Sequence, residues 1–195
     1  MISSLLNPLW MEITAVLLAI IYLLLAIKQD VRCWYAAFIS SFIYFFIMLD
    51  ANLYMEAYLQ IFYMLMAAYG WSLWNKTDNN NRQFIVRTWS INQHLIIISM
   101  IFILAYLSGS LLIFYTDAAL PFIDAFTTIG AIVSTYMVAK KLLENWIYWF
   151  VIDSISVFLF MSRGLFLTAL LFILYLIIIY FGFRSWIKIK QEMNE

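Results

Sequence analysis

The chain has 195 residues, of which 66% are hydrophobic and only 11% are charged. A soluble domain is nearer half apolar and about a quarter charged, so this composition excludes an ordinary soluble domain. Because the net charge is zero, nothing predicts a nucleic-acid partner. The chain has one cysteine, Cys33, and one histidine, His94. No internal disulfide can therefore form, and we expect no metal site and no cofactor.

Apolar runs of about 20 residues match the hydrocarbon thickness of a bilayer, and they fill most of the sequence. Backbone groups inside a bilayer must be paired within the segment, which favours helices. The sequence therefore predicts an all-α, polytopic membrane protein with seven helices in a single transmembrane domain, residues 1–195. The helices are expected at about 9–27, 33–49, 53–74, 94–115, 118–139, 146–161 and 164–186. The start of the fifth helix depends on Pro121, which could also lie just inside a helix.

Seven spans sort the basic residues onto the two sides of the membrane. One side holds Lys28, Arg32, Lys76, Arg82, Arg87, Lys140, Lys141, Arg184, Lys188 and Lys190, and the other holds Arg163. Basic residues concentrate in cytoplasmic loops. We therefore expect the N-terminus outside the cell, or in the periplasm, and the C-terminus in the cytoplasm.

The sequence also contains an internal repeat. Residues 12–74 align with residues 124–186 without a gap, at an offset of 112 positions. Scarce residues coincide in this alignment, namely Trp34 with Trp146, Gly70 with Gly182 and Trp74 with Trp186. The first repeat would span about 9–74 and the second about 118–186, joined by the helix at 94–115. This predicts a parallel 3+1+3 repeat of the SWEET type, in which the substrate site lies near mid-membrane between the repeats.

The sixth predicted helix carries the most informative residue. Asp153 lies eight residues beyond Asn145, about 12 Å along a helix, where a carboxylate is costly and usually functional. One face of this helix carries Trp146, Trp149, Asp153 and Ser156. Two indoles and a carboxylate predict a slot for a flat cation. The alternatives are a structural hydrogen bond for Asp153 and an interfacial position for Trp146.

The third predicted helix has a second polar stripe. Glu56, Gln60 and Tyr63 follow one helical face, and Gln60 lies at about the depth of Asp153. An amide both donates and accepts hydrogen bonds, which suits a ribose hydroxyl, an amide or a pyrimidine. The alternative for Gln60 is an interhelical hydrogen bond, and Glu56 could instead reach the headgroups.

Other residues are expected to have structural roles. Ser134, Thr135 and Ser154 are small polar residues that should pack helices, and His94 is expected merely at a helix end. The indoles of Trp34, Trp74 and Trp186 are expected as anchors in the aromatic belt at the cytoplasmic boundary. No nucleophile–base pair and no phosphate-binding glycine loop is present in the sequence, so we do not expect an enzyme.

Three segments carry a resemblance to a known family. The segment LQIFYMLMAAYGWSLW (59–74) resembles the third helix of the PnuC family. The segment ENWIYWFVIDSISVFLF (144–160) resembles the Trp-x-x-Trp-x-x-x-Asn/Asp signature of that family, and RGLFLTALLFILYLIIIYFGFRSW (163–186) resembles its last helix. The similarity covers most of the chain.

The resemblance implies a vitamin transporter of the bacterial inner membrane that works by facilitated diffusion. Members carry nicotinamide riboside, thiamine or riboflavin, and phosphorylation by a cytoplasmic kinase traps the substrate. The kinase would be a functional partner only, and a homo-oligomer stays open. The matching motif residues are Trp146, Trp149, Asp153, Gln60 and Tyr63.

The sequence leaves the substrate open. Asp153 occupies a position that is Asn in some nicotinamide riboside carriers. Nicotinamide riboside, the first hypothesis, and thiamine, the second, are both cations that an Asp suits, and the shortness of the chain resembles thiamine-type members. Two other classes are an intramembrane enzyme acting on a lipid and a subunit that only scaffolds partners.

Overall fold

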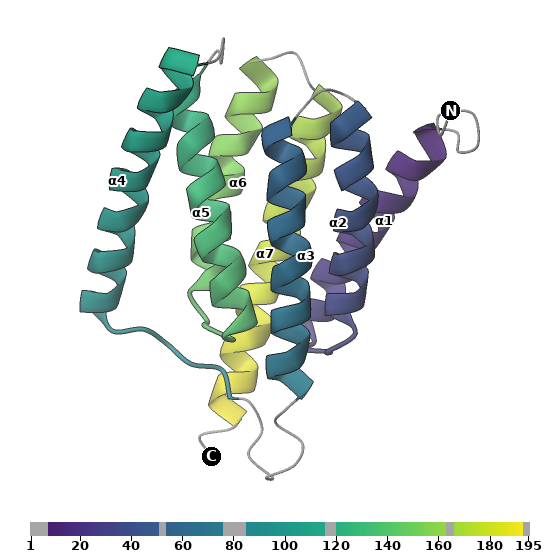
Figure 1. Cartoon of the computed structure of the whole chain (residues 1–195). Coiled ribbons are helices and arrows are strands. Elements are labelled where there is room, and N and C mark those ends of the chain that lie inside the picture. The colour runs from purple at the N-terminus through teal and green to yellow at the C-terminus, as the bar shows by residue number, and fades with distance from the viewer. Residues whose placement is uncertain (1–7, 51–53, 76–84, 116–119, 163–165, 193–195) are drawn as a thin grey trace. The chain divides into compact units, whose positions relative to one another are not determined.

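The computed structural model describes residues 8–50, 54–75, 85–115, 120–162 and 166–192. Within these residues the chain forms seven α-helices and one isolated β-bridge (Figure 1). The helices are α1 (Pro8–Ile27), α2 (Cys33–Asp50), α3 (Tyr54–Asn75), α4 (Ile91–Tyr115), α5 (Pro121–Ala139), α6 (Asn145–Ser162) and α7 (Phe166–Glu192). The predicted all-α class with seven helices is therefore confirmed.

Apolar length differs between the helices. Among the described residues, four helices are long and apolar enough to cross a membrane, and they are α1, α4, α5 and α7. Shorter apolar stretches occupy Cys33–Ile47 in α2 and Asn145–Leu159 in α6. Polar residues within the helices, such as Gln60 in α3 and Asp153 in α6, reduce the hydropathy of the spans that carry them.

Three helix boundaries differ from the sequence prediction by three residues or more. The fourth helix begins at Ile91, not at 94, because the Ser90 N–H donates to Gln93 Oε1 at 2.8 Å and so caps an earlier start. The fifth begins at Pro121, where a proline fits the first helical position, and its predicted start at 118 lies outside the described residues. The seventh continues beyond 186 to Glu192.

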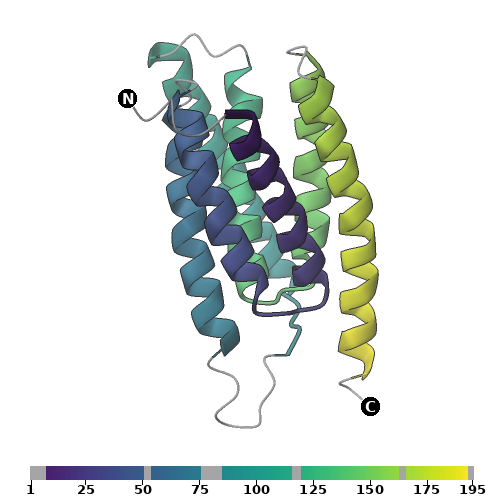
Figure 2. The same ribbon diagram turned by 90° about the vertical axis from the view of Figure 1, so that its right-hand side faces the viewer.

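The helices belong to two compact units, Met1–Ile85 and Val86–Glu195, here named unit 1 and unit 2. In unit 1, α2 packs against both α1 and α3. In unit 2, α5 packs against α4 and α6, and α6 packs against α7. Figures 1 and 2 show these neighbours side by side within each unit. Each unit is therefore built by consecutive helices that pack in chain order.

The turns after α1 and α5 have the same backbone conformation. Gln29 and Lys141, which are 112 positions apart, have φ values of 55° and 52°. Their N–H groups donate to the carbonyls three residues back at 3.0 and 2.9 Å, and the next N–H groups donate five residues back at 3.0 and 2.9 Å. These two bonds define a Schellman motif, which usually has glycine at this position. Both turns therefore place a residue other than glycine in the left-handed backbone conformation, which costs about 1–2 kcal/mol.

In unit 1, an indole fills the space beside a glycine. The Trp34 ring on α2 lies so close to Gly70 on α3 that a Cβ at Gly70 would clash with it. Trp74, one turn further along α3, meets the same indole edge-on, with ring centroids 5.2 Å apart and an interplanar angle of 81°. Tyr22 on α1 also lies near this ring, at 6.1 Å. The indole therefore contacts both helices that pack against α2.

In unit 2, the matching residues make the same contacts. The Trp146 ring on α6 lies against Gly182 on α7, where a Cβ would clash with it. Trp186 meets Trp146 edge-on at 5.4 Å and 89°. All three residues lie 112 positions after their counterparts in unit 1. Together with the matching turns, these contacts support the predicted repeat of three helices.

The prediction of an aromatic belt was wrong for Trp34, Trp74 and Trp186. An anchor in the headgroup region exposes its ring, whereas these indoles are 2%, 7% and 0% exposed. The glycines explain the difference, because a residue without a side chain lets the indole of the neighbouring helix reach the helix backbone. These tryptophans are packing residues.

We expect Gly70→Ala and Gly182→Ala to lower the Tm of the purified protein in detergent. Each added methyl meets a rigid indole, and overpacking typically costs about 1–3 kcal/mol, against a helix-propensity gain of about 1 kcal/mol. The matched control is Gly130→Ala, because its Cβ would meet the movable Cδ1 of Ile152. Wild-type Tm in both test variants would contradict the packing role of the indoles.

Candidate functional site

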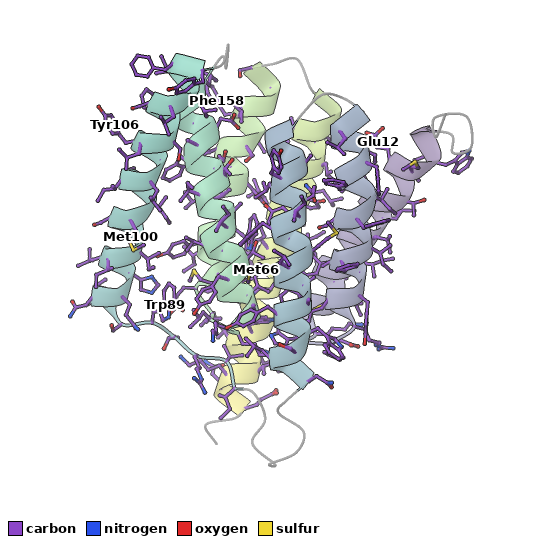
Figure 3. All side chains as sticks on the ribbon, in the orientation of Figure 1. Glu12, Met66, Trp89, Met100, Tyr106 and Phe158 are labelled. Atoms are coloured by element: carbon purple, nitrogen blue, oxygen red, sulfur yellow. The ribbon has the colours of Figure 1, made fainter. Side chains whose placement is uncertain are left out.

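α6 carries the carboxyl group that the sequence singles out. Asp153 lies near the middle of this helix, and only 3% of its surface is exposed. Within the described residues its carboxyl group makes no hydrogen bond and no ion pair. Figure 3 labels Trp89 near the start of α4 and Phe158 toward the opposite end of α6. A buried polar group without a partner loses its hydration uncompensated, so Asp153 is the best candidate to meet a substrate.

The other predicted residues of the α6 face have different surroundings. Trp146 is packed against α7, as described above, whereas Trp149 is half-buried. Ser156 is buried, and its hydroxyl donates to the carbonyl of Ile152 in its own helix at 3.0 Å. Among the described residues, therefore, Trp149 is the indole of this face that makes no such ring contact. Substrate contact by Trp146 stays a prediction.

The α3 stripe belongs to unit 1. Gln60 and Tyr63 are half-buried there, and the Tyr63 ring lies 6.0 Å from that of Phe62. The side chain of Glu56 lies outside the described residues. Because units 1 and 2 are described separately, the roles of Gln60 and Tyr63 in the same site as Asp153 stay predictions.

The two units differ at the position of the carboxyl group. Ser41 on α2 is the counterpart of Asp153 at the offset of 112, and it is buried as well. Beside it, the Ser40 hydroxyl donates to the Ala15 carbonyl at 2.8 Å and so links α2 to α1. The repeat thus preserves a buried polar position but carries a charge-bearing group only in unit 2.

The hydroxyl groups of α5 pair locally. Ser134 donates to the carbonyl of Gly130 and Thr135 to that of Ala131, both at 2.8 Å. Both side chains are buried, and such bonds within the helix leave no unpaired donor for chemistry. This agrees with the packing role expected for them. In the part of the chain that the structure describes, no three His, Cys, Asp or Glu side chains lie close enough to hold a metal ion.

The sequence prediction missed a polar cluster at the start of α6. His94 on α4 lies with its Nδ1 2.9 Å from the Tyr148 hydroxyl and its Nε2 3.8 Å from Glu144 Oε1. Three atoms of this region are buried without a hydrogen-bond partner among the described residues, namely the second carboxylate oxygen of Glu144, Oδ1 of Asn145 and the indole nitrogen of Trp146. A signal was available, since Ser90 and Gln93 form a Ser-x-x-Gln capping box that fixes where α4 begins and where His94 stands.

Comparison with known proteins identifies the family. A model of the nicotinamide mononucleotide transporter family matches residues 9–188. The chain belongs to this family. It is a transporter and not an enzyme, and its helices make it a multi-pass membrane protein. The resemblance to PnuC proteins predicted from three segments is thereby confirmed.

Two characterised relatives span nearly the whole chain. The nicotinamide riboside transporter PnuC of Escherichia coli (strain K12) is 22% identical over 208 residues, which cover 94% of this chain and 87% of that protein. The riboflavin/roseoflavin transporter RibM of Streptomyces davaonensis is 27% identical over 184 residues, which cover 91% of this chain and 84% of that protein. The family thus includes transporters of different vitamins.

A solved structure shows the same fold. The crystal structure of the vitamin B3 transporter PnuC matches with a TM-score of 0.75 at 20% identity, over 94% of this chain and 83% of that one. The family and this structure therefore agree on the helical architecture. At such low identity the likeness shows the fold alone, so the substrate has to be inferred from the residues of this chain.

We expect substitutions of the two indoles of α6 to separate packing from binding. Trp146→Phe should lower the Tm, because it leaves a gap against Gly182 and Trp186. Trp149→Ala should leave the Tm within a few degrees of wild type and weaken substrate binding about tenfold or more, as loss of an aromatic contact to a desolvated cation can cost ~2 kcal/mol. Differential scanning fluorimetry and calorimetric titration measure the two effects. The reverse pattern would make Trp146 the binding residue.

Proposed function

We propose that this transporter carries a flat, positively charged vitamin across the cytoplasmic, or inner, membrane of a bacterium, and that its substrate is nicotinamide riboside. One observation carries the proposal, namely that Asp153 on α6 is a buried residue whose carboxyl group has no hydrogen-bond or ion-pair partner among the described residues. A cationic substrate would supply the missing partner for this group, and the half-buried Trp149 one turn away offers a ring face to the same cation.

The relatives narrow the set of candidate substrates but do not identify one. PnuC of Escherichia coli is named for nicotinamide riboside and RibM for riboflavin and roseoflavin. Riboflavin is neutral, so it gives no electrostatic reason for an unpaired carboxyl group in a membrane span. Thiamine, like nicotinamide riboside, is a cation and is the second candidate. Gln60 and Tyr63 on α3 are proposed to hold the ribose hydroxyls or the amide.

The driving force is proposed to be cytoplasmic phosphorylation. A carrier that moves its substrate by facilitated diffusion needs no ion gradient, and a kinase that phosphorylates the vitamin keeps uptake running downhill. The distribution of basic residues supports an orientation with the C-terminus in the cytoplasm. The kinase is then a functional partner on that side.

We expect purified protein to bind nicotinamide riboside more tightly than thiamine or riboflavin, as measured by calorimetry or tryptophan fluorescence. Asp153→Ala should weaken binding more than Asp153→Asn, because an amide still accepts hydrogen bonds from the substrate. Loss of a hydrogen bond to a charged group typically costs ~1.5–3 kcal/mol, so we expect a loss of about tenfold or more for Asp153→Ala.

The control for this experiment is Ser154→Ala, since the Ser154 hydroxyl bonds only to the Phe150 carbonyl of its own helix. It should bind like the wild type. Equal affinity of the wild type and both Asp153 variants would end the assignment of Asp153. Tight binding of thiamine alone would move the proposal to thiamine, and tight binding of riboflavin alone would remove the argument from charge.

Vesicles that contain only this protein test the driving force. We expect radiolabelled substrate to equilibrate across the membrane without a proton or sodium gradient. Enclosing a kinase and ATP in the vesicles should then produce accumulation of the phosphorylated vitamin. Accumulation of the unmodified vitamin above its outside concentration, in vesicles without kinase, would contradict facilitated diffusion.

A further inference from the structure

The start of α4 is built to hold one side chain in a fixed place. Ser90 caps the helix, and its N–H bonds to Gln93 Oε1 at 2.8 Å. In such a start the residue before the cap packs on the residue four positions into the helix. Here these residues are Trp89 and His94, and their rings lie edge-on with centroids 5.7 Å apart. Trp89 lies at the end of unit 2 where α4 begins (Figure 3). A histidine thus occupies a position that ordinarily takes an apolar residue.

The histidine reaches a helix that α4 does not pack against. Among the described residues α4 packs only on α5, and α6 packs on α5 and α7. His94 nevertheless lies 2.9 Å from the hydroxyl of Tyr148, in the first turn of α6, and 3.8 Å from the carboxylate of Glu144, the residue before α6. The His94 and Tyr148 rings lie 5.8 Å apart at an angle of 31°. The imidazole therefore links α4 to α6 through the hydrogen bond at Nδ1, while its Nε2 lies near the Glu144 carboxylate.

The backbone joins the same two places. The Arg87 N–H donates to the Lys141 carbonyl at 3.0 Å, and the Leu143 N–H donates to the Arg87 carbonyl at 2.9 Å. This pairing attaches the segment before α4 to the turn that leads into α6. It fixes the turn, while the His94 contacts fix the helix that follows. The start of α6 is thus held both by the backbone pairing of the preceding turn and by the His94 side chain.

In the described residues of unit 1, the matching turn makes a different contact. The counterparts of Tyr148 and Glu144 at the offset of 112 are Ala36 and Arg32. Arg32 bonds instead to Asp30, two residues away in its own turn, at 2.6 Å. The connection therefore occurs beside the helix that carries Asp153 and not beside the one that carries Ser41. The His94 connection thus lies in unit 2, the unit that also carries the Asp153 carboxyl group.

We propose that His94 is a positioning residue for substrate binding, which holds the first turn of α6 through Tyr148 and so sets the direction of the neighbouring Trp149 ring. This inference deepens the proposed function and rests on it. Tyr148 and Trp149 are adjacent and point about 100° apart around the helix. His94 therefore acts through α6 without touching the substrate, and a rotation of the first turn moves the Trp149 ring with it.

Two substitutions of His94 separate this role from simple packing. Leucine keeps an apolar contact with Trp89 and removes the hydrogen-bond partner of the Tyr148 hydroxyl. Asparagine removes most of the ring contact, but its amide oxygen can stand near the former Nδ1 and accept the Tyr148 hydrogen bond. We expect His94→Leu to keep the wild-type Tm and to bind nicotinamide riboside about tenfold more weakly. His94→Asn should lower the Tm and keep affinity within about threefold of wild type.

Tyr148→Phe provides the partner test. It should weaken binding as much as His94→Leu does, and the double variant should bind no more weakly than either single one, since both remove the same hydrogen bond. Wild-type affinity in His94→Leu, or affinity and Tm falling together in every variant, would overturn the positioning role. If the wild type binds none of the three vitamins, the proposed function fails. Wild-type amide hydrogen exchange at the first turn of α6 in His94→Leu would then overturn the tie between His94 and α6 separately.

Discussion

Polar groups inside a bilayer have no water to pair with, and this constraint organises the whole chain. It makes every described span a helix, because a helix pairs its own backbone groups. It also explains the hydroxyl groups of the spans, since Ser134, Thr135 and Ser156 all donate to carbonyls of their own helices. Asp153 departs from this pattern. Asp153 is buried, and its carboxyl group has no partner within the described part of the chain, which is why we propose a partner from outside the protein.

Each unit is stabilised by an indole that lies on a glycine of the next helix. Trp34 on Gly70 and Trp146 on Gly182 bring pairs of helices into close contact, and an edge-on tryptophan completes each contact. Rigid rings against bare backbone leave little room for adjustment. Such contacts make each unit rigid within itself.

The two units share their construction and differ in their chemistry. They share the left-handed turn residue, the Schellman bonds and the indole contact. They differ where unit 2 has Asp153 and the His94 connection to α6. The common contacts thus give both units the same framework, while the carboxyl group and the His94 connection are features of unit 2.

The sequence by itself determined the membrane class, the seven helices and the family, because apolar length and scarce residues such as Trp and Gly leave few alternatives. It also singled out Asp153, since a charge within an apolar run is conspicuous without a structure. Only the tertiary structure decided which tryptophans pack and which stay available, because that depends on the glycines opposite them. The role of His94 was likewise invisible, since its partners Tyr148 and Glu144 lie some 50 residues away and no local pattern encodes a contact between distant helices.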